Sequence, residues 1–174
     1  INYHDLQITY EGMYSISPYK IAQEFVKRLR QIIPEPLEHL VITDGTGGVG
    51  GDAMAFSPVF KFVNVVEIQT LHYNVIKNNL KVYGFNRKSK VINGDYTKLY
   101  TAVHQDIIYM DPPWGGLNYK TIKELPLYMG DTFVGDLVAD IKKKKLARYV
   151  VIKVPNNFTF ELFYQKVGRR CCQI

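Results

Sequence analysis

Short apolar runs alternate along this chain with longer stretches in which apolar positions recur every three or four residues. The runs predict strands at residues 40–43, 62–67, 90–95, 106–110 and 148–155, of which residues 106–110 read as a buried parallel strand. The periodic stretches predict helices at residues 19–33, 69–83, 132–145 and 158–167. Alternating strands and helices indicate an α/β fold, in which a mostly parallel, twisted sheet carries helices on both faces. Right-handed crossovers place the carboxyl ends of these strands on one rim.

Prolines bound the first predicted helix. Ser17-Pro18 predicts its start, with serine as the N-cap and proline at the first helical position, and Pro34 ends it. Residues 1–38 are therefore expected to form an N-terminal arm and helix packed on the core, and residues 39–174 the sheet-containing domain. The chain begins with isoleucine, which suggests processing or trimming. A truncation at the C-terminus is also left open.

Candidate chemistry gathers behind the fourth predicted strand, in Asp111-Pro112-Pro113-Trp114-Gly115-Gly116. Pro112 cannot donate to a sheet ladder, so the strand ends there and the chain turns outward. An acid and a flat aromatic ring thus reach the rim at which open α/β sheets bind ligands. A nucleobase stacked on Trp114 could donate its exocyclic amine to the Asp111 carboxylate and the Pro112 carbonyl. A methyl donor on the other side would then complete an amine methyltransferase site.

The alternative is an ordinary strand-to-loop turn with a buried tryptophan. A pair of prolines alone would favour that interpretation. The combination of an acid, two prolines, the only tryptophan and two glycines favours the functional one.

A glycine-rich loop, residues 44–51, follows the first predicted strand. Small residues in a strand-to-helix turn let backbone N–H groups approach a ligand closely. Gly45, Gly47 and Gly50 satisfy the G-x-G-x-x-G pattern of dinucleotide sites. The Gly-Lys-Ser/Thr ending of a phosphate-binding P-loop is missing from the sequence, which disfavours that class.

Three acids come at or just after the ends of the first three predicted strands. Glu67 lies about 20 residues beyond the glycine loop, where an acid that binds ribose hydroxyls is expected. Asp95 could accept a hydrogen bond from an adenine amine, and Asp44 precedes the glycine loop. Each acid alone could equally be a helix N-cap. Three acids on one rim favour a nucleoside site.

Composition adds less. The 174 residues are 47% hydrophobic and 22% charged, which suits a single soluble domain. No apolar stretch is long enough to span a bilayer, and no signal peptide is visible. The adjacent Cys171 and Cys172 predict no disulfide framework and a reducing compartment. A net charge of +6 permits an RNA partner without requiring one, since the basic clusters Lys142–Lys145 and Arg169–Arg170 could be solvated helix faces.

Two classes of nucleoside cofactor fit this rim. A dehydrogenase needs a general acid beside the nicotinamide, and none of the four histidines lies in such a context. His104, for example, falls at the start of the fourth strand, on the opposite edge. Asp111-Pro112-Pro113-Trp114 suits an amine acceptor, so we predict an S-adenosylmethionine-dependent methyltransferase.

Several motifs occur together in an order that resembles the trimethylguanosine synthase family, the RNA cap guanine-N2 methyltransferases. They are Glu11-Gly12-Met13-Tyr14-Ser15-Ile16-Ser17-Pro18, Asp44 with Gly48-Val49-Gly50-Gly51, Asn78-Asn79 with Val82-Tyr83-Gly84, Gly94-Asp95 and Pro112-Pro113-Trp114-Gly115-Gly116. The resemblance covers nearly the whole chain. It implies a Rossmann-like class I methyltransferase domain with a short N-terminal helical extension, acting on 7-methylguanosine caps.

The resemblance also assigns roles to residues. The catalytic set is Asp111, Pro112 and Trp114. The cofactor-binding set is Ser17, Asp44, Gly45, Thr46, Gly47, Glu67, Ile68, Asp95, Tyr96 and Asp111. The substrate-binding set is Trp114, Asn118, Tyr119, Lys153 and Asn156. Because 7-methylguanine is cationic, stacking on Trp114 gains a cation–π term of roughly 0.5–2 kcal/mol.

Two positions depart from the family pattern. Gln7 stands where the family typically has a lysine, and Asn156 where it has an arginine. Those basic residues are associated with the cap triphosphate, so weaker or differently made triphosphate contacts are expected here, with Lys153 or Lys20 as candidates to make them.

The implied reaction methylates the exocyclic N2 amine, giving 2,7-dimethyl- and, after a second transfer, 2,2,7-trimethylguanosine. The partners expected are capped RNA or a cap dinucleotide, with no metal and no membrane, and the protein is expected to be an intracellular monomer of the nucleus or cytoplasm, with a viral origin left open. An N6-adenine or ribosomal guanine-N2 methyltransferase stays an alternative, because Asp-Pro-Pro-aromatic also serves those amines. A non-catalytic, methyltransferase-like RNA-binding subunit is the alternative of another class.

Overall fold

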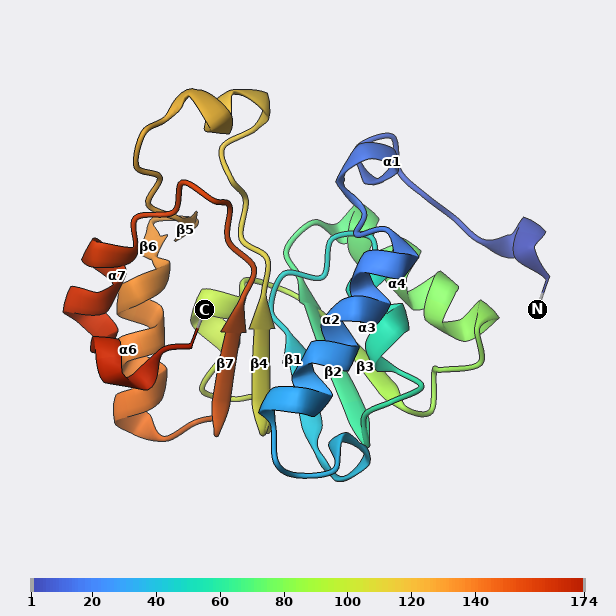
Figure 1. Cartoon of the computed structure of the whole chain (residues 1–174). Coiled ribbons are helices and arrows are strands. Elements are labelled where there is room, and N and C mark those ends of the chain that lie inside the picture. Colours follow the sequence, from blue (N-terminus) through green and yellow to red (C-terminus); the bar gives the residue numbers. More distant parts are fainter. Residues whose placement is uncertain (1, 174) are drawn as a thin grey trace.

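A five-stranded parallel sheet forms the centre of the molecule in a computed structural model that describes residues 2–173 (Figure 1). Its strands are β1 (Val41–Asp44), β2 (Phe62–Glu67), β3 (Ser89–Asn93), β4 (Ile107–Met110) and β7 (Tyr149–Ile152). The strand order is β3-β2-β1-β4-β7, so the chain moves outward in one direction from β1 to β3 and then in the other from β4 to β7. The direction reverses between β1 and β4, and ligands of open α/β sheets bind at such a point.

Helices cover both faces of this sheet. The α-helices are α1 (Gly12–Ser15), α2 (Tyr19–Ile32), α3 (Gly51–Phe56), α4 (Thr70–Val82), α5 (Tyr96–Leu99), α6 (Val134–Lys144) and α7 (Phe160–Val167). Short 3-10 turns occupy Tyr3–Asp5, Leu37–His39, Leu117–Thr121 and Arg169–Cys171. Helices α2, α3 and α4 lie on one side of the sheet and α6 and α7 on the other (Figure 1).

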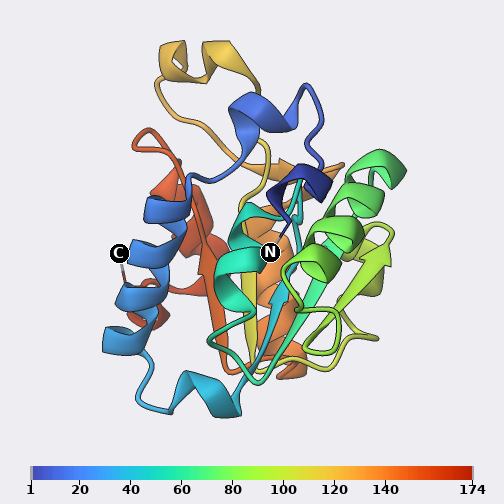
Figure 2. The same ribbon diagram turned by 90° about the vertical axis from the view of Figure 1, so that its right-hand side faces the viewer.

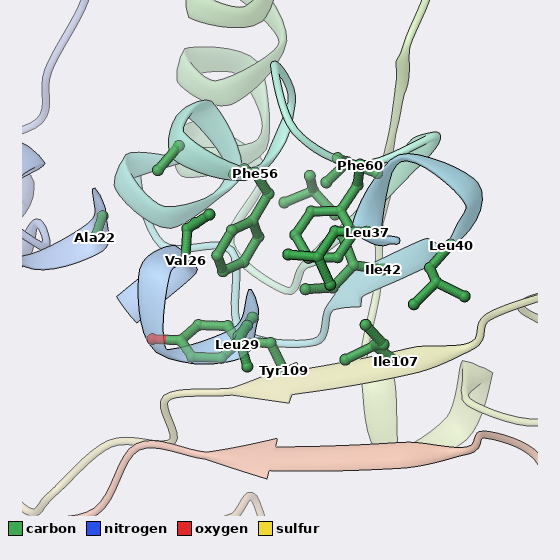
Figure 3. Packing of buried hydrophobic residues seen from close by; sticks show 14 of the residues in the cluster. Ala22, Val26, Leu29, Leu37, Leu40, Ile42, Phe56, Phe60, Ile107 and Tyr109 are labelled. Carbon is green, nitrogen blue, oxygen red and sulfur yellow. The ribbon is translucent and has the colours of Figure 1, made fainter. Parts of the chain in front are cut away.

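Alternation along the strands divides the core between the two faces. On β4, Ile107 and Tyr109 join the cluster formed with α2 and α3, whereas Ile108 and Met110 join the cluster formed with α6 and α7. Figure 3 shows the first cluster, in which the Phe56 ring meets Tyr109 edge to face at 5.2 Å between centroids. Burial on both faces explains why the inner strands β1, β2 and β4 read as continuous apolar runs, whereas the edge strands β3 and β7 are only partly buried. The predicted α/β fold, parallel sheet and two-sided helical cover are confirmed.

Three local predictions need correction. Helix α2 begins at Tyr19, and Ser17 does not cap it, because its hydroxyl donates to Asp52 instead. The helix expected from residue 132 begins at Val134, since Thr132–Phe133 (β6) pairs antiparallel with Tyr128–Met129 (β5). Helix α5 was not predicted, and its N-cap Asp95 lies two residues beyond the end of β3.

The N-terminal segment lies across the glycine loop. A Cβ on Gly51 would fall 2.7 Å from Ile16 Cγ1, and one on Gly12 would fall 2.6 Å from Val49 Cγ1. Asn79 of α4 fixes the arm further, accepting from the Gln7 N–H at 2.9 Å and donating to the Gln7 carbonyl at 2.8 Å. The boundary predicted between residues 38 and 39 stays a prediction. Among residues 2–173, no helix combines the length and apolar character needed to cross a membrane.

Candidate active site

A cavity of about 550 Å³ opens at the carboxyl ends of β1, β2 and β4, within the size range of small-molecule sites. Its lining includes the glycine loop, the acids after β2 and β3, the Asp111–Trp114 turn and the arm around Ser17. The lining carboxylates belong to Glu11, Asp52, Glu67, Asp95 and Asp111, and one lysine, Lys153, accompanies them. This excess of negative charge suits a ligand that carries a positive charge.

The glycine loop is shaped by close packing beneath it. A Cβ on Gly45 would fall 2.7 Å from the Tyr96 ring, and one on Gly47 would fall 2.7 Å from Val65 Cγ1. Gly48 and Gly50 have φ angles of +53° and +91°, which favour glycine. The loop also reaches β4, because the Asp111 N–H donates to Thr46 Oγ1 at 2.7 Å. The two sides of the sheet reversal are thereby held together.

Asp44 lies beneath this loop rather than in the cavity lining. Its side chain is 1% exposed, and Oδ1 accepts from the Thr46 N–H at 3.0 Å. Burial raises the pKa of the Asp44 carboxyl well above its usual value, and the negative charge of Asp52 raises it further. The predicted direct contact between Asp44 and the cofactor stays a prediction.

Glu67 ends β2 at the cavity wall and already binds two backbone groups. Its Oε2 accepts from the Gly48 N–H and its Oε1 from the Gln69 N–H, both at 2.7 Å. Since an ionised carboxylate has about four lone-pair sites, each oxygen can still accept one ligand hydroxyl. Ile68 follows with a 65% exposed side chain on the cavity surface.

Asp95 and Tyr96 close the opposite part of the wall. Asp95 caps α5 through the Thr97 N–H at 2.9 Å, so the N-cap alternative holds for this residue. Burial would raise the pKa of Asp95, but hydrogen bonds from Thr97 and the charge of Lys98 outweigh it and lower the pKa. Tyr96 is buried under Gly45 and donates its hydroxyl to Gln105. Tyr96 thus supports the loop from below.

Asp111 lies at the centre of a polar chain that crosses the cavity. Its Oδ2 is 2.6 Å from Lys153 Nζ, which also lies 3.3 Å from Ser17 Oγ. Ser17 in turn donates to Asp52 Oδ2 at 2.7 Å. Burial raises the pKa of Asp111, whereas the hydrogen bond and charge of Lys153 act to lower it. Lys153 directly follows β7, and Asp111 directly follows β4. The residue after one strand therefore acts to lower the pKa of the acid after its neighbour.

Trp114 lines the same cavity as a half-buried ring. Lys153 Nζ lies 5.8 Å from the ring centroid, and the Tyr119 ring packs against Trp114 edge to face at 5.2 Å. The buried indole Nε1 has no hydrogen-bond partner among the described residues. Tyr119 contacts Trp114 but does not line the cavity. Asn118 and Asn156 are exposed and do not line the cavity either.

Sequence analysis missed Asp52 and the arm residues around Tyr14. Asp52 accepts from both Ser17 and the Tyr109 hydroxyl, at 2.7 and 3.2 Å. An acid in the first turn of a helix that follows a glycine loop was a signal that could have identified it. Tyr14 reaches the cavity because the arm folds back over the loop, which local sequence does not reveal.

Sheet order, a glycine loop at the reversal point and acids on the rim together define the Rossmann-like methyltransferase class of fold. A solved structure of the precorrin-6y C5,15-methyltransferase from Geobacter metallireducens shares this fold, with a TM-score of 0.53 and 15% identity over 67% of this chain and 58% of that one. The profile of the RNA cap guanine-N2 methyltransferases matches residues 39–169. The chain belongs to that family, as its motifs predicted.

Two relatives show how far the similarity extends. An uncharacterised protein of Acanthamoeba polyphaga mimivirus is 32% identical over 133 residues, covering 75% of this chain and 52% of that protein. The trimethylguanosine synthase of Schizosaccharomyces pombe is 28% identical over 126 residues, covering 68% of this chain and 51% of that enzyme. The chain thus spans about half the length of these relatives.

Proposed function

We propose that this protein methylates the exocyclic N2 amine of the 7-methylguanosine cap of RNA, using S-adenosylmethionine. The observation that carries the proposal is that one cavity holds both halves of the reaction. The glycine loop and Glu67 line one part of it, and Asp111 and Trp114 line another. Membership of the cap guanine-N2 family supports the same reaction.

The residues of the first half fit the donor. Glu67 offers free lone pairs to ribose hydroxyls, and the loop from Gly45 to Gly48 brings backbone close to a ligand. The five lining carboxylates favour a cation. When bound, S-adenosylmethionine supplies an electrophilic methyl group on its positively charged sulfur.

The residues of the second half orient the acceptor. Lys153 binds Oδ2 of Asp111, which leaves Oδ1 for an N–H of the substrate amine, and the Pro112 carbonyl is the second acceptor. Hydrogen bonds accepted from both N–H groups favour a more tetrahedral nitrogen, whose lone pair is then localised and can align with the methyl group of the donor. Positioning of this kind supplies up to about 7–11 kcal/mol in favourable intramolecular systems. As the N–C bond forms, the bond between the methyl group and sulfur would break and release S-adenosylhomocysteine. The methylated nitrogen would then lose a proton to the Asp111 carboxylate, so no other general base is required.

Trp114 selects the base by charge and shape. A flat cationic purine stacked on the indole gains roughly 0.5–2 kcal/mol over a neutral one. Lys153 lies near the same ring, and its positive charge is offset by Asp111 at 2.6 Å. The ion pair thus keeps the stacking site from repelling a cationic base.

Mass spectrometry of a 7-methylguanosine cap dinucleotide incubated with protein and S-adenosylmethionine tests this function. We expect the mass of one or two added methyl groups, located on N2 by fragmentation. Parallel incubations contain unmethylated cap, uncapped RNA and DNA. Transfer to adenine or to uncapped RNA in preference to the cap would support the alternative amine methyltransferases. Binding of the donor without transfer to any of these would support a non-catalytic subunit.

A further inference from the structure

A second cavity, of about 670 Å³, runs along α2 on the outer side of the site. It lies between α2, α3 and the segment after α4, and we call it the α2 groove. Its lining is Ile16, Ser17, Tyr19, Gln23, Val26, Lys27, Arg30, Gly51, Met54, Ala55, Pro58, Val59, Tyr83 and Phe85. Ile16, Ser17 and Gly51 also line the first cavity, so the two cavities share a wall.

The groove leads from the rim, where the strands end, toward the side of the sheet where the strands begin. Its near end is at Ser17, whose hydroxyl is 3.3 Å from Lys153 Nζ beside Asp111. Helix α4 returns from the end of β2 to the start of β3, so Tyr83 and Phe85 mark the far edge. Figures 1 and 2 show α2 descending beside α3 along this side of the sheet.

One stripe of α2 faces the groove. Tyr19, Gln23, Lys27 and Arg30 recur every three or four residues, which places them on one side of the helix over ~16 Å at 1.5 Å per residue. Both charged side chains of the described lining, Lys27 and Arg30, are basic and exposed. Lys27 Nζ lies 3.8 Å from Glu24 Oε2, and Glu24 lies outside the lining.

Aromatic rings lie at both ends of the stripe. Tyr19, 67% exposed, stands at the near end. At the far end the Tyr83 and Phe85 rings are half-buried and parallel, with an interplanar angle of 5° and centroids 6.1 Å apart. Many proteins bind single-stranded nucleic acid with such a combination, in which cationic side chains contact the phosphates and aromatic rings stack on the bases.

We propose that the α2 groove binds the first few nucleotides of the RNA downstream of the cap. This inference rests on the proposed function, since it requires a cap stacked on Trp114. The groove shares a wall with that site, its charges are complementary to phosphate, and the whole chain carries a net charge of +6. An amphipathic peptide is the rival occupant, because Val26, Met54 and Val59 line part of the groove. Basic charge and the wall shared with the first cavity favour RNA.

Steady-state kinetics on a cap dinucleotide and on a capped, unstructured hexanucleotide test the proposal. We expect KM to be about tenfold lower for the hexanucleotide, because added phosphate contacts release counterions. Arg30→Glu should remove most of that gain and leave KM for the dinucleotide within about twofold. The matched control is Arg28→Glu, which makes the same charge change on α2 outside the groove and should leave the gain intact.

Salt dependence provides a second measurement. In the double variant Lys27→Ala/Arg30→Ala, the log of the affinity for the hexanucleotide should fall less steeply with the log of the salt concentration. The slope should be smaller in magnitude by about 1.4, since each lost contact with a single strand removes about 0.7. A thermal melt of each variant checks that it folds.

The outcomes separate the two proposals. Turnover of the dinucleotide with no length effect, or with equal losses in Arg28→Glu and Arg30→Glu, would overturn the groove proposal and leave the function standing. No turnover of either capped substrate would overturn the function and this inference with it.

Discussion

Lys153 Nζ lies 2.6 Å from Asp111 Oδ2, which joins the residues just beyond the ends of two neighbouring strands, β7 and β4. The pair is partly buried, with side-chain exposures of 33% and 25%. Asp111 would otherwise face the negative charge of Asp52 with no nearby cation among the groups that shift its pKa. Lys153 therefore favours the ionised state of Asp111, which the proposed role as acceptor of an amine N–H requires.

The first prediction concerns the pH dependence of turnover. Because Asp111 must be ionised to accept, activity falls as pH drops through its pKa. Burial raises that pKa and Lys153 lowers it, so Lys153→Met should raise it further and move the acidic limb of the kcat/KM profile to higher pH. Lys153→Arg, which keeps the charge, should leave the limb nearly in place. An unmoved limb in Lys153→Met would exclude this role.

Trp114 gives the second prediction. Trp114→Ala should raise KM for a 7-methylguanosine cap by about 2- to 30-fold from the cation–π term alone, and further through lost contact area. Binding of S-adenosylhomocysteine, measured by calorimetry, should change little. Trp114→Phe keeps a flat ring with a weaker cation–π interaction and should fall between the two. Equal KM values for all three proteins would count against stacking.

The third prediction concerns stability and the buried Asp44. A carboxyl whose folded pKa is raised contributes no penalty at low pH and destabilises the fold as pH rises through that pKa. Asp44→Asn keeps an oxygen for the Thr46 N–H and removes the buried charge. The melting temperature of the variant should therefore gain on that of the wild type between about pH 4 and pH 8. A constant difference would mean that Asp44 does not titrate over that range.

Asn79 provides the fourth prediction, about the arm. Two of its side-chain hydrogen bonds reach the backbone of Gln7, and the residue is 5% exposed. Asn79→Ala should cost about 1–3 kcal/mol of unfolding free energy and accelerate proteolysis of the arm before residue 17. Donor affinity should fall as well, since Tyr14 and Ser17 line the cavity. Asn78→Ala removes the hydrogen bonds that Asn78 donates to the Asp5 carbonyl and to Asn79 Oδ1 but leaves both bonds between Asn79 and Gln7, so it should have a smaller effect.

The rim could be predicted from the sequence because it follows from local patterns. An apolar run that ends in Asp111-Pro112 fixes both the strand and the position of the acid at its tip. Glu67 and Asp95 followed in the same way from their places after apolar runs. Parallel topology then brought these separate positions together.

What the sequence did not reveal depends on contacts between distant residues. The ion pair of Asp111 and Lys153 joins positions 42 residues apart, and Ser17 meets Asp52 across 35. Ser17 precedes a proline and a stretch of helical apolar periodicity, which favoured an N-cap. Its hydroxyl instead donates a hydrogen bond to the carboxylate of Asp52 in α3. The β5–β6 hairpin has two residues in each strand, too few to produce an alternating pattern.

The reversal of strand order between β1 and β4 also divides labour along the chain. Apart from Asp111, which is assigned to both sets, the residues proposed to bind the donor come from the stretch that ends with α5, and those proposed to bind the base come from β4 onward. Substitutions in the later stretch can therefore retarget the enzyme to another amine while the machinery that presents the methyl group is inherited unchanged.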